Sequence, residues 1–314
     1  DRQIRDKIAL FCNVPKKCVL QNLDVEYLYE APLAMEEEHL AQVTCKCLNL
    51  ECPTPDLTDW KDMVNALRHP NKEVDIALVG KYIQLHDAYI SVVEALKHGG
   101  IDNRAVVNIK WIDSETVTEE NADELLGDVT GILVPGGFGN RGIEGKIEAI
   151  KYARTHNVPT FGICLGMQCM AIEFARNVLG YTDANSREMD EKTPHNVIDI
   201  MEEQKAITNM GGTMRLGAYE CILDQHSKTF EAYKSEHIQE RHRHRYEFNN
   251  DYKQEYEKAG MKCVGTNPES DLVEIIEIPT LKWFIGVQFH PEYSSTVLKP
   301  HPLFLSFIKA AIDK

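Results

Sequence analysis

Cys164 is the residue whose surroundings most clearly predict chemistry. It stands in Gly162-Ile163-Cys164-Leu165-Gly166, which has the form G-x-C-x-G. This is a thiol version of the nucleophile elbow, in which small flanking residues permit a sharp strand-to-helix turn that presents the nucleophile. The N-terminus of the following helix would favour the thiolate, and the backbone N–H of Leu165 would face a developing oxyanion. The alternative is a small cysteine buried at a tight packing contact.

A cysteine nucleophile needs a base, and His290 is the best placed of the 12 histidines. It lies in Gln288-Phe289-His290-Pro291-Glu292, directly after an apolar run typical of a buried strand. Catalytic groups gather at the carboxyl ends of parallel strands, so His290 and Cys164 would share one rim of the sheet. Glu292 would accept a hydrogen bond from the far ring nitrogen and fix the tautomer. The pattern predicts a Cys-His-Glu relay, and its alternative is a strand end followed by a solvated glutamate.

A glycine-rich loop, residues 135–139, provides the second expected oxyanion donor. Its sequence is Pro-Gly-Gly-Phe-Gly, and it too follows an apolar run. Glycines let the backbone approach a ligand closely, so the N–H of Gly137 would meet the substrate carbonyl oxygen. A phosphate-binding loop is the competing interpretation. No G-x-x-x-x-G-K-[ST] motif supports it, because Gly145-Lys146 is followed by Ile147.

The elements that must position these residues alternate between strand and helix from residue 74 onward. Continuous apolar strands separated by amphipathic helices predict an α/β fold with a mostly parallel central sheet and helices on both faces. Strands are expected at 76–80, 105–112, 131–134 and 160–163, and then, in a more β-rich part, at 216–223, 261–264, 273–278 and 283–289. Helices are expected at 89–96 with a stop at Gly99-Gly100, and at 119–126, 143–150, 165–178 and from Pro302.

Residues 1–70 have a different pattern, with few apolar runs. Short strands are expected at 8–11 and 18–20, followed by an acidic helix at 35–42 and a proline-bearing segment. Such a stretch would make a poor independent core. It is therefore interpreted as an appendage or the remnant of a neighbouring domain, which leaves 71–314 as the main domain. The absence of an initial methionine also suggests a piece of something larger.

Composition excludes several classes of partner. The net charge of −15 opposes general affinity for nucleic acid or anionic lipid, so no nucleic acid and no membrane are expected. No long apolar run and no signal peptide are seen, which together with nine irregularly spaced cysteines predicts reduced thiols in the cytoplasm. Cys45, Cys47 and Cys52 lack a second pair at zinc-site spacing, so no metal is expected.

The chain resembles the triad (class I) glutamine amidotransferases, and within them the glutaminase portion of the CTP synthase family. The resemblance covers nearly the whole chain. G-x-C-x-G and H-P-E indicate only the wider class, whereas the motifs at 211–217 and 240–247 are much narrower. The matching motifs are 135–142 (PGGFGNRG), 162–168 (GICLGMQ), 184–186 (ANS), 211–217 (GGTMRLG), 240–247 (ERHRHRYE) and 288–292 (QFHPE).

The resemblance implies a role for each matching residue. Cys164 would be the nucleophile, His290 the base and then the acid, and Glu292 its orienter. Glutamine would lie against Gly137, Leu165 and Gln168, with Glu188 toward its amino group and Arg245 toward its carboxylate. These last two pairings are electrostatically sensible.

Without the resemblance, the segment 241–245 (RHRHR) has two other interpretations. The extended period of two would put three arginines on one face and two histidines on the other. A basic surface strand is the first interpretation, and metal binding by His242 and His244 is the second.

The resemblance also implies partners beyond this chain. The ammonia released from L-glutamine would be used by an amidoligase domain that converts UTP to CTP with ATP and Mg, in an enzyme that is a homotetramer at full length. Arg141, Gly142 and Glu144 would belong to a lid where GTP acts as an allosteric activator. Lys7, Asp24 and Val25 match only part of a nucleotide site, because the phosphate loop of that domain is absent.

Two other functions stay open. One is a non-catalytic module that binds glutamine or a nucleotide and regulates a partner. The other is a γ-glutamyl peptidase on the same fold. The complete relay favours an enzyme over the regulatory module. A peptidase would explain Cys164 and His290 but not Arg245 with Glu188.

Overall fold

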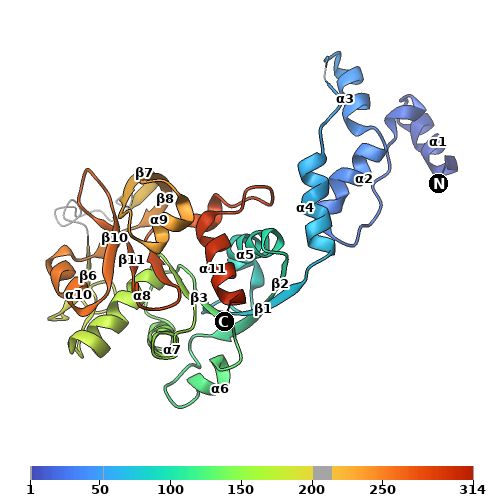
Figure 1. Cartoon of the computed structure of the whole chain (residues 1–314). Coiled ribbons are helices and arrows are strands. Elements are labelled where there is room, and N and C mark those ends of the chain that lie inside the picture. Colours follow the sequence, from blue (N-terminus) through green and yellow to red (C-terminus); the bar gives the residue numbers. More distant parts are fainter. Residues whose placement is uncertain (1, 52, 201–213, 314) are drawn as a thin grey trace. The chain divides into compact units, whose positions relative to one another are not determined.

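The structure, a computed structural model, describes residues 2–51, 53–200 and 214–313. It divides into two compact units, Asp1–His69 and Pro70–Lys314, and each is described by itself (Figure 1). Cys52, considered above with Cys45 and Cys47, lies outside the described residues, as does part of the motif at 211–217.

The first unit is helical. The strands expected at 8–11 and 18–20 are wrong: the first run lies inside a helix, because Ile4, Ile8 and Phe11 follow helical spacing, and the second begins at the end of a 3₁₀ turn. The helix expected at 35–42 is broken in two at His39, whose φ is 60°. The elements are α1 (Arg2–Phe11), α2 (Ala31–Glu37), α3 (Leu40–Leu48) and α4 (Thr58–Arg68).

The second unit is built on a nine-stranded sheet, which confirms the α/β fold class. Strands β2, β1, β3, β4 and β12 are mutually parallel, and β11, β10, β7 and β8 extend the β12 side in antiparallel fashion. The strands are β1 (Lys72–Gly80), β2 (Ala105–Asp113), β3 (Gly131–Val134), β4 (Thr160–Ile163), β7 (Arg215–Leu223), β8 (His237–His244), β10 (Lys262–Thr266), β11 (Val273–Glu277) and β12 (Phe284–Val287).

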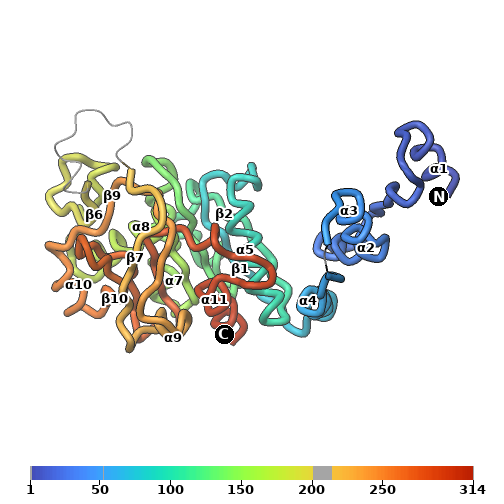
Figure 2. The backbone as a smooth tube through the Cα atoms, turned by 90° about the horizontal axis from the view of Figure 1, so that it is seen from above, coloured from blue at the N-terminus to red at the C-terminus, as the bar shows by residue number. Residues whose placement is uncertain are grey.

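Helices cover both faces of the parallel part, as the continuous apolar strands predict. Along β1, Ala77 and Val79 pack into one core while Ile76 and Leu78 pack into the other, because successive side chains point to opposite faces. The first core is completed by α7 (Ile143–Thr155) and α8 (Leu165–Phe174), and the second by α5 (Ile90–Asp102) and α11 (Pro302–Ile312). Figure 2 shows α5 and α11 side by side next to β1.

Helix α5 differs from its prediction at its end. It continues through Gly99-Gly100 to Asp102 instead of stopping there. A Cβ on Gly99 would lie 2.9 Å from the carbonyl oxygen of Phe304, and one on Gly100 would lie 2.6 Å from Val107 Cγ2. These glycines therefore permit close packing against α11 and β2, and they do not end the helix.

The remaining elements surround the far end of the sheet. A small second sheet joins β5 (Asn185–Ser186), β6 (Asn196–Ile200) and β9 (Tyr246–Phe248). The short helices are α6 (Ala122–Leu126), α9 (Lys228–Tyr233) and α10 (Lys253–Ala259), and a π-helical turn, Ala175–Leu179, follows α8. None of the helices in the described part of the chain is long and apolar enough to cross a membrane.

Candidate active site

Three parallel strands end at one edge of the sheet and bring the predicted segments together. In the register of the sheet, Val134 of β3 lies opposite Gly162 of β4, and Ile163 of β4 lies opposite Val287 of β12. The loop after β3, the turn after β4 and the segment after β12 consequently start side by side. This edge carries the glycine-rich loop, Cys164 and the histidine motif.

Cys164 occupies a strained turn between β4 and α8. Its φ of 52° and ψ of −103° are rare for any residue with a side chain, and such strain is characteristic of functional sites. The turn requires glycine on both sides: a Cβ on Gly162 would lie 2.3 Å from Met170 Sδ, and one on Gly166 would lie 2.0 Å from the Val134 carbonyl oxygen. The Cys164 N–H donates to the Val287 carbonyl at 2.7 Å, which ties the turn to β12.

His290 lies beside Cys164 and is oriented by Glu292. Its Nδ1 donates to Glu292 Oε1 at 2.8 Å. A Cβ placed on Gly136 would be 3.0 Å from His290 Cε1 and 3.5 Å from Cys164 Cβ, so both side chains face the same glycine. The second ring nitrogen, Nε2, is buried and has no hydrogen-bond partner within the described residues. It is the nitrogen available to exchange a proton with the thiol.

The protonation of His290 is set by three effects. Burial lowers the pKa of His290, but the Cys164 side chain and the Glu292 carboxylate together raise it more, to about 11. Each of these neighbours stabilises the imidazolium more than the neutral ring. The resting histidine is therefore able to hold a proton beside the sulfur at neutral pH.

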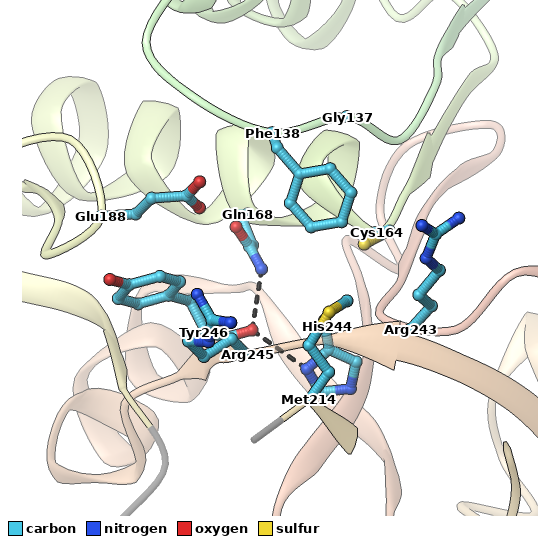
Figure 3. Close-up of a pocket in the computed structure, with 10 residues that line it drawn as sticks. All are labelled: Gly137, Phe138, Cys164, Gln168, Glu188, Met214, Arg243, His244, Arg245 and Tyr246. Carbon is cyan, nitrogen blue, oxygen red and sulfur yellow. Dashed lines mark hydrogen bonds between the residues drawn. The ribbon is translucent and has the colours of Figure 1, made fainter. Parts of the chain in front are cut away.

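A cavity of about 220 Å³ opens in front of the Cys164 sulfur (Figure 3). Its walls carry one carboxylate, Glu188, and the guanidinium groups of Arg243 and Arg245. The residues that line it are Gly137, Phe138, Cys164, Gln168, Glu188, Met214, Arg243, His244, Arg245 and Tyr246. A small zwitterion fits this combination of volume and opposite charges.

A second cavity, of about 440 Å³, lies on the histidine side of the sulfur. Cys164, Gly137, Phe138 and Arg243 line both cavities, whereas His290 and Glu292 line only this second one. Cys164 thus lies between a cavity lined by one carboxylate and two guanidinium groups and a cavity lined by His290 and Glu292.

Gln288 is a site residue that the sequence does not single out by itself. Its Nε2 lies 3.6 Å from Cys164 Sγ, and its Oε1 accepts from Gln168 Nε2 at 3.1 Å. Gln168 also donates to the Tyr246 carbonyl at 2.9 Å. Gln168, which the resemblance places against the substrate, is therefore connected to the Cys164 sulfur through Gln288. The place of Gln288 at the start of the histidine motif is the signal that marks it.

The alternation predicted for residues 241–245 is present in β8, where His242 and His244 are buried and Arg241 and Arg243 are exposed. His244 Nδ1 donates to the Tyr246 carbonyl at 3.1 Å, and its Nε2 lies 2.9 Å from His242 Nδ1. Burial, followed by the charge of nearby groups, lowers the pKa of His244 well below its usual value. A neutral His244 therefore lines the cavity together with Arg245, and it is held in place by the Tyr246 carbonyl and His242.

The remaining predicted residues are placed as follows. Leu165 begins α8, and its side chain packs beside Gly137. Arg141 donates to the Lys81 carbonyl at 3.1 Å and pairs with Glu115, and Glu144 pairs with Arg176 at 2.7 Å.

Gly142 of the expected lid caps α7 with a φ of 73°. None of Arg141, Gly142 and Glu144 is among the residues that line the two cavities.

Lys7, Asp24 and Val25 belong to the first unit. Lys7 is an exposed residue of α1, and Asp24 and Val25 lie in an irregular segment after the first 3₁₀ turn. Among the residues that the structure describes, no group of three or more His, Cys, Asp or Glu side chains is arranged to hold a metal ion.

Comparison with known proteins relates this site to a family. Residues 84–310 match the family described as glutamine amidotransferase class-I, and residues 1–50 match the one described as CTP synthase N-terminus. The chain is 65% identical over 312 residues to a CTP synthase of Bacteroides fragilis and 55% identical over 311 residues to one of Clostridium beijerinckii, covering 99% of this chain in each case. It spans 58% of the length of each of these two relatives.

A solved structure agrees with these sequence matches. The glutaminase domain of a CTPS from Trypanosoma brucei, with bound acivicin, is 42% identical, with a TM-score of 0.72. The match covers 77% of this chain and 94% of that domain. The predicted resemblance is thereby confirmed: the chain belongs to the class-I glutamine amidotransferase family and carries the glutaminase portion found in CTP synthases.

Proposed function

We propose that this chain hydrolyses L-glutamine to glutamate and ammonia through a thioester on Cys164. The observation that carries the proposal is the placement of the sulfur, at a strained turn, between the His290–Glu292 pair and a cavity with one carboxylate and two guanidinium groups. The family supports the same chemistry.

Substrate selection follows from the charges of the 220 Å³ cavity. Glu188 would bind the α-ammonium group of glutamine, and Arg245 would bind its α-carboxylate through a charge-assisted pair. Anchoring both ends of the amino acid leaves the side-chain amide directed at Cys164. Gln168, fixed by its bonds to Gln288 and the Tyr246 carbonyl, would limit the position of that amide.

In the first half-reaction the Cys164 thiolate attacks the amide carbon of the side chain. The negative charge that develops on oxygen would be met by the N–H groups of Gly137 and Leu165. Leu165 is the first residue of α8, and the first N–H groups of a helix have no partner within the helix. The C–N bond then breaks, and His290 gives its proton to the leaving nitrogen, which departs as ammonia. A γ-glutamyl thioester remains on the sulfur.

In the second half-reaction His290, now neutral, takes a proton from water. The resulting hydroxide attacks the thioester carbon, the C–S bond breaks, and glutamate leaves with a new carboxylate. Glu292 keeps the imidazole in the orientation that serves both steps, through the bond to Nδ1.

The wider role concerns a longer protein than this chain. The ammonia would pass to an amidoligase domain that aminates UTP to CTP with ATP and Mg, and GTP would act as an allosteric activator through the lid of Arg141, Gly142 and Glu144. The full-length enzyme would be a cytoplasmic homotetramer. The names of the curated relatives support this role, and Lys7, Asp24 and Val25 would contribute only part of a nucleotide site.

A substrate comparison tests the proposal against its two alternatives. The wild-type chain is incubated with L-glutamine or with γ-glutamyl peptides, and glutamate release is followed, with Cys164→Ala as the control for contamination. Release from glutamine alone, absent in the variant, is the expected result. Faster release from peptides would favour a γ-glutamyl peptidase, and glutamine binding without any release would favour a regulatory module.

A further inference from the structure

Lys146 is a buried cation that the mechanism above does not use. It lies near the start of α7, and its residue is 0% exposed to solvent. Its amino group bonds to a backbone carbonyl and, within the described residues, to no carboxylate, although a buried lysine is normally paired because an isolated buried charge is costly. If Lys146 served packing alone, an apolar side chain of similar size would fill the same space without the cost of burying an amino group. A role beyond packing is therefore indicated.

The amino group of Lys146 lies directly beneath the glycine-rich loop. Its Nζ donates to the Pro135 carbonyl oxygen over 3.5 Å, and a Cβ on Gly137 would lie 3.9 Å from it. The same amino group is close enough to Cys164 and Cys169 to interact electrostatically with both. Lys146 thus contacts the peptide unit that directly precedes the one carrying the Gly137 N–H.

The surroundings of Lys146 act on its pKa in opposite directions. Burial lowers the pKa of Lys146, nearby Lys81 lowers it further, and the two cysteines oppose this effect. An anion formed beside it, either the Cys164 thiolate or the oxyanion on the substrate, would supply the counter-charge that the resting protein does not provide through a carboxylate.

A second lysine holds the other end of the same loop. Lys81, itself buried, donates from Nζ to the Phe138 carbonyl. The carbonyls of Pro135 and Phe138 flank Gly136 and Gly137, so both ends of the diglycine are held by lysines. Glycine has no side chain to fix its own peptide orientation, which makes such external bonds necessary.

We infer that Lys146 is a positioning residue for glutamine hydrolysis: it holds the Pro135 carbonyl so that the Gly137 N–H faces the reacting oxygen, and it places a positive charge under the developing anion. This inference rests on the proposed glutaminase function. It gives a role to Lys146 of the Gly145-Lys146 pair, which does not belong to a phosphate-loop motif.

The test compares Lys146→Met with Lys151→Met, a matched control on the same helix whose amino group pairs with Glu119 at the surface. For Lys146→Met we expect kcat for glutamine to fall by at least about tenfold, because a displaced oxyanion donor costs catalysis, while KM changes less than about threefold. Its thermal midpoint should stay equal to or above that of wild type, because an amino group buried without a carboxylate partner is replaced by an apolar side chain. Lys151→Met should match wild type in kcat.

A second variant separates the hydrogen bond from the charge. Lys146→Gln keeps an N–H donor without charge, and its kcat should lie between those of Lys146→Met and wild type. A Gln variant no faster than the Met variant would contradict the role given to the hydrogen bond.

Two outcomes would overturn the inference as a whole. One is a folded Lys146→Met protein with kcat within about threefold of wild type, and the other is a loss of kcat that is matched by a loss of thermal stability. An inactive wild-type chain would instead contradict the proposed function itself, so the two failures are distinguishable.

Discussion

At the scale of single residues, the backbone strain at Cys164 allows the role of its thiol in activity to be tested separately from its effect on stability. Its φ of 52° is one that glycine adopts freely and alanine does not. We expect Cys164→Ala and Cys164→Gly both to abolish glutamine hydrolysis, and the Gly variant to be more stable than the Ala variant by about 1 kcal/mol. Urea unfolding of both variants, with glutamate release as the activity assay, checks this. Residual hydrolysis in either variant would show that the thiol is dispensable.

The relay predicts unequal effects for its other two members. His290→Asn should stop turnover, whereas Glu292→Gln should leave measurable activity, because orienting a base matters less than having one. Steady-state glutamate release by both variants measures the difference. Equal loss in the two would indicate that Glu292 takes a direct part in the chemistry.

The raised pKa of His290 also predicts how stability depends on pH. The folded-state pKa of about 11 exceeds the ordinary value of 6.5, so the folded chain binds a proton there more tightly than the unfolded chain does. This contribution is fully present below about pH 6.5 and is lost as pH rises toward 11, with a limiting slope of about 1.4 kcal/mol per pH unit. We expect the stability difference between wild type and His290→Asn to shrink between pH 7 and 10, as measured by urea unfolding. A constant difference would contradict the pKa shift.

At the scale of elements, the sequence predicts the parallel strands well because each is a short apolar run bounded by turn residues. Strands β3 and β4 match their predicted bounds, so the glycine-rich loop and Cys164 directly follow strands as predicted. The errors arise where a local signal has two meanings. Gly99-Gly100 reads as a helix stop but serves close packing, and residues 8–11 read as a strand although Ile4 and Ile8 already show helical spacing.

Helix α5 offers a test of that correction. In an open helix, Gly99→Ala would stabilise by about 1 kcal/mol through helix propensity. Here the added Cβ would lie 2.9 Å from the Phe304 carbonyl oxygen of α11, so we expect the substitution to destabilise the chain by about 1–3 kcal/mol. Lys97→Ala, on the exposed side of α5, should change stability by less than about 0.5 kcal/mol. A more stable Gly99→Ala protein in urea unfolding would contradict the close packing of α5 and α11.

Part of the site is predictable from the sequence because its residues directly follow short apolar strands. Cys164, His290 and Glu292 stand in short motifs at strand ends, so type and spacing suffice to find them. Lys81 and Lys146 are brought to the glycine-rich loop only by the fold, from the residue after β1 and from α7, and their spacing in the sequence carries no common period. Gln288, directly after β12, is marked only by its place in the histidine motif, and its contact with the sulfur follows from the fold. Contacts between elements of this kind need the structure.

At the scale of the whole molecule, we expect the chain to carry out only the glutaminase half of the activity proposed for the longer protein. It spans 58% of the Bacteroides fragilis relative, and the phosphate loop expected of an amidoligase domain is absent from its sequence. Given saturating UTP, ATP, magnesium and ammonia, it should form no CTP while it still hydrolyses glutamine slowly. Absorbance of the cytosine product measures this, and CTP above a no-enzyme control would contradict the expectation by showing a complete nucleotide site in this chain.

The central claim is that Cys164 is a nucleophile facing a pocket for glutamine. The most direct measurement is the intact mass of the wild-type chain after incubation with a glutamine-like diazo-ketone, followed by peptide mapping. We predict a single adduct on Cys164, formed more slowly in the presence of excess L-glutamine and absent from Cys164→Ala. Unmodified protein, or adducts spread over the exposed cysteines such as Cys12 and Cys47 without protection by glutamine, would contradict the account.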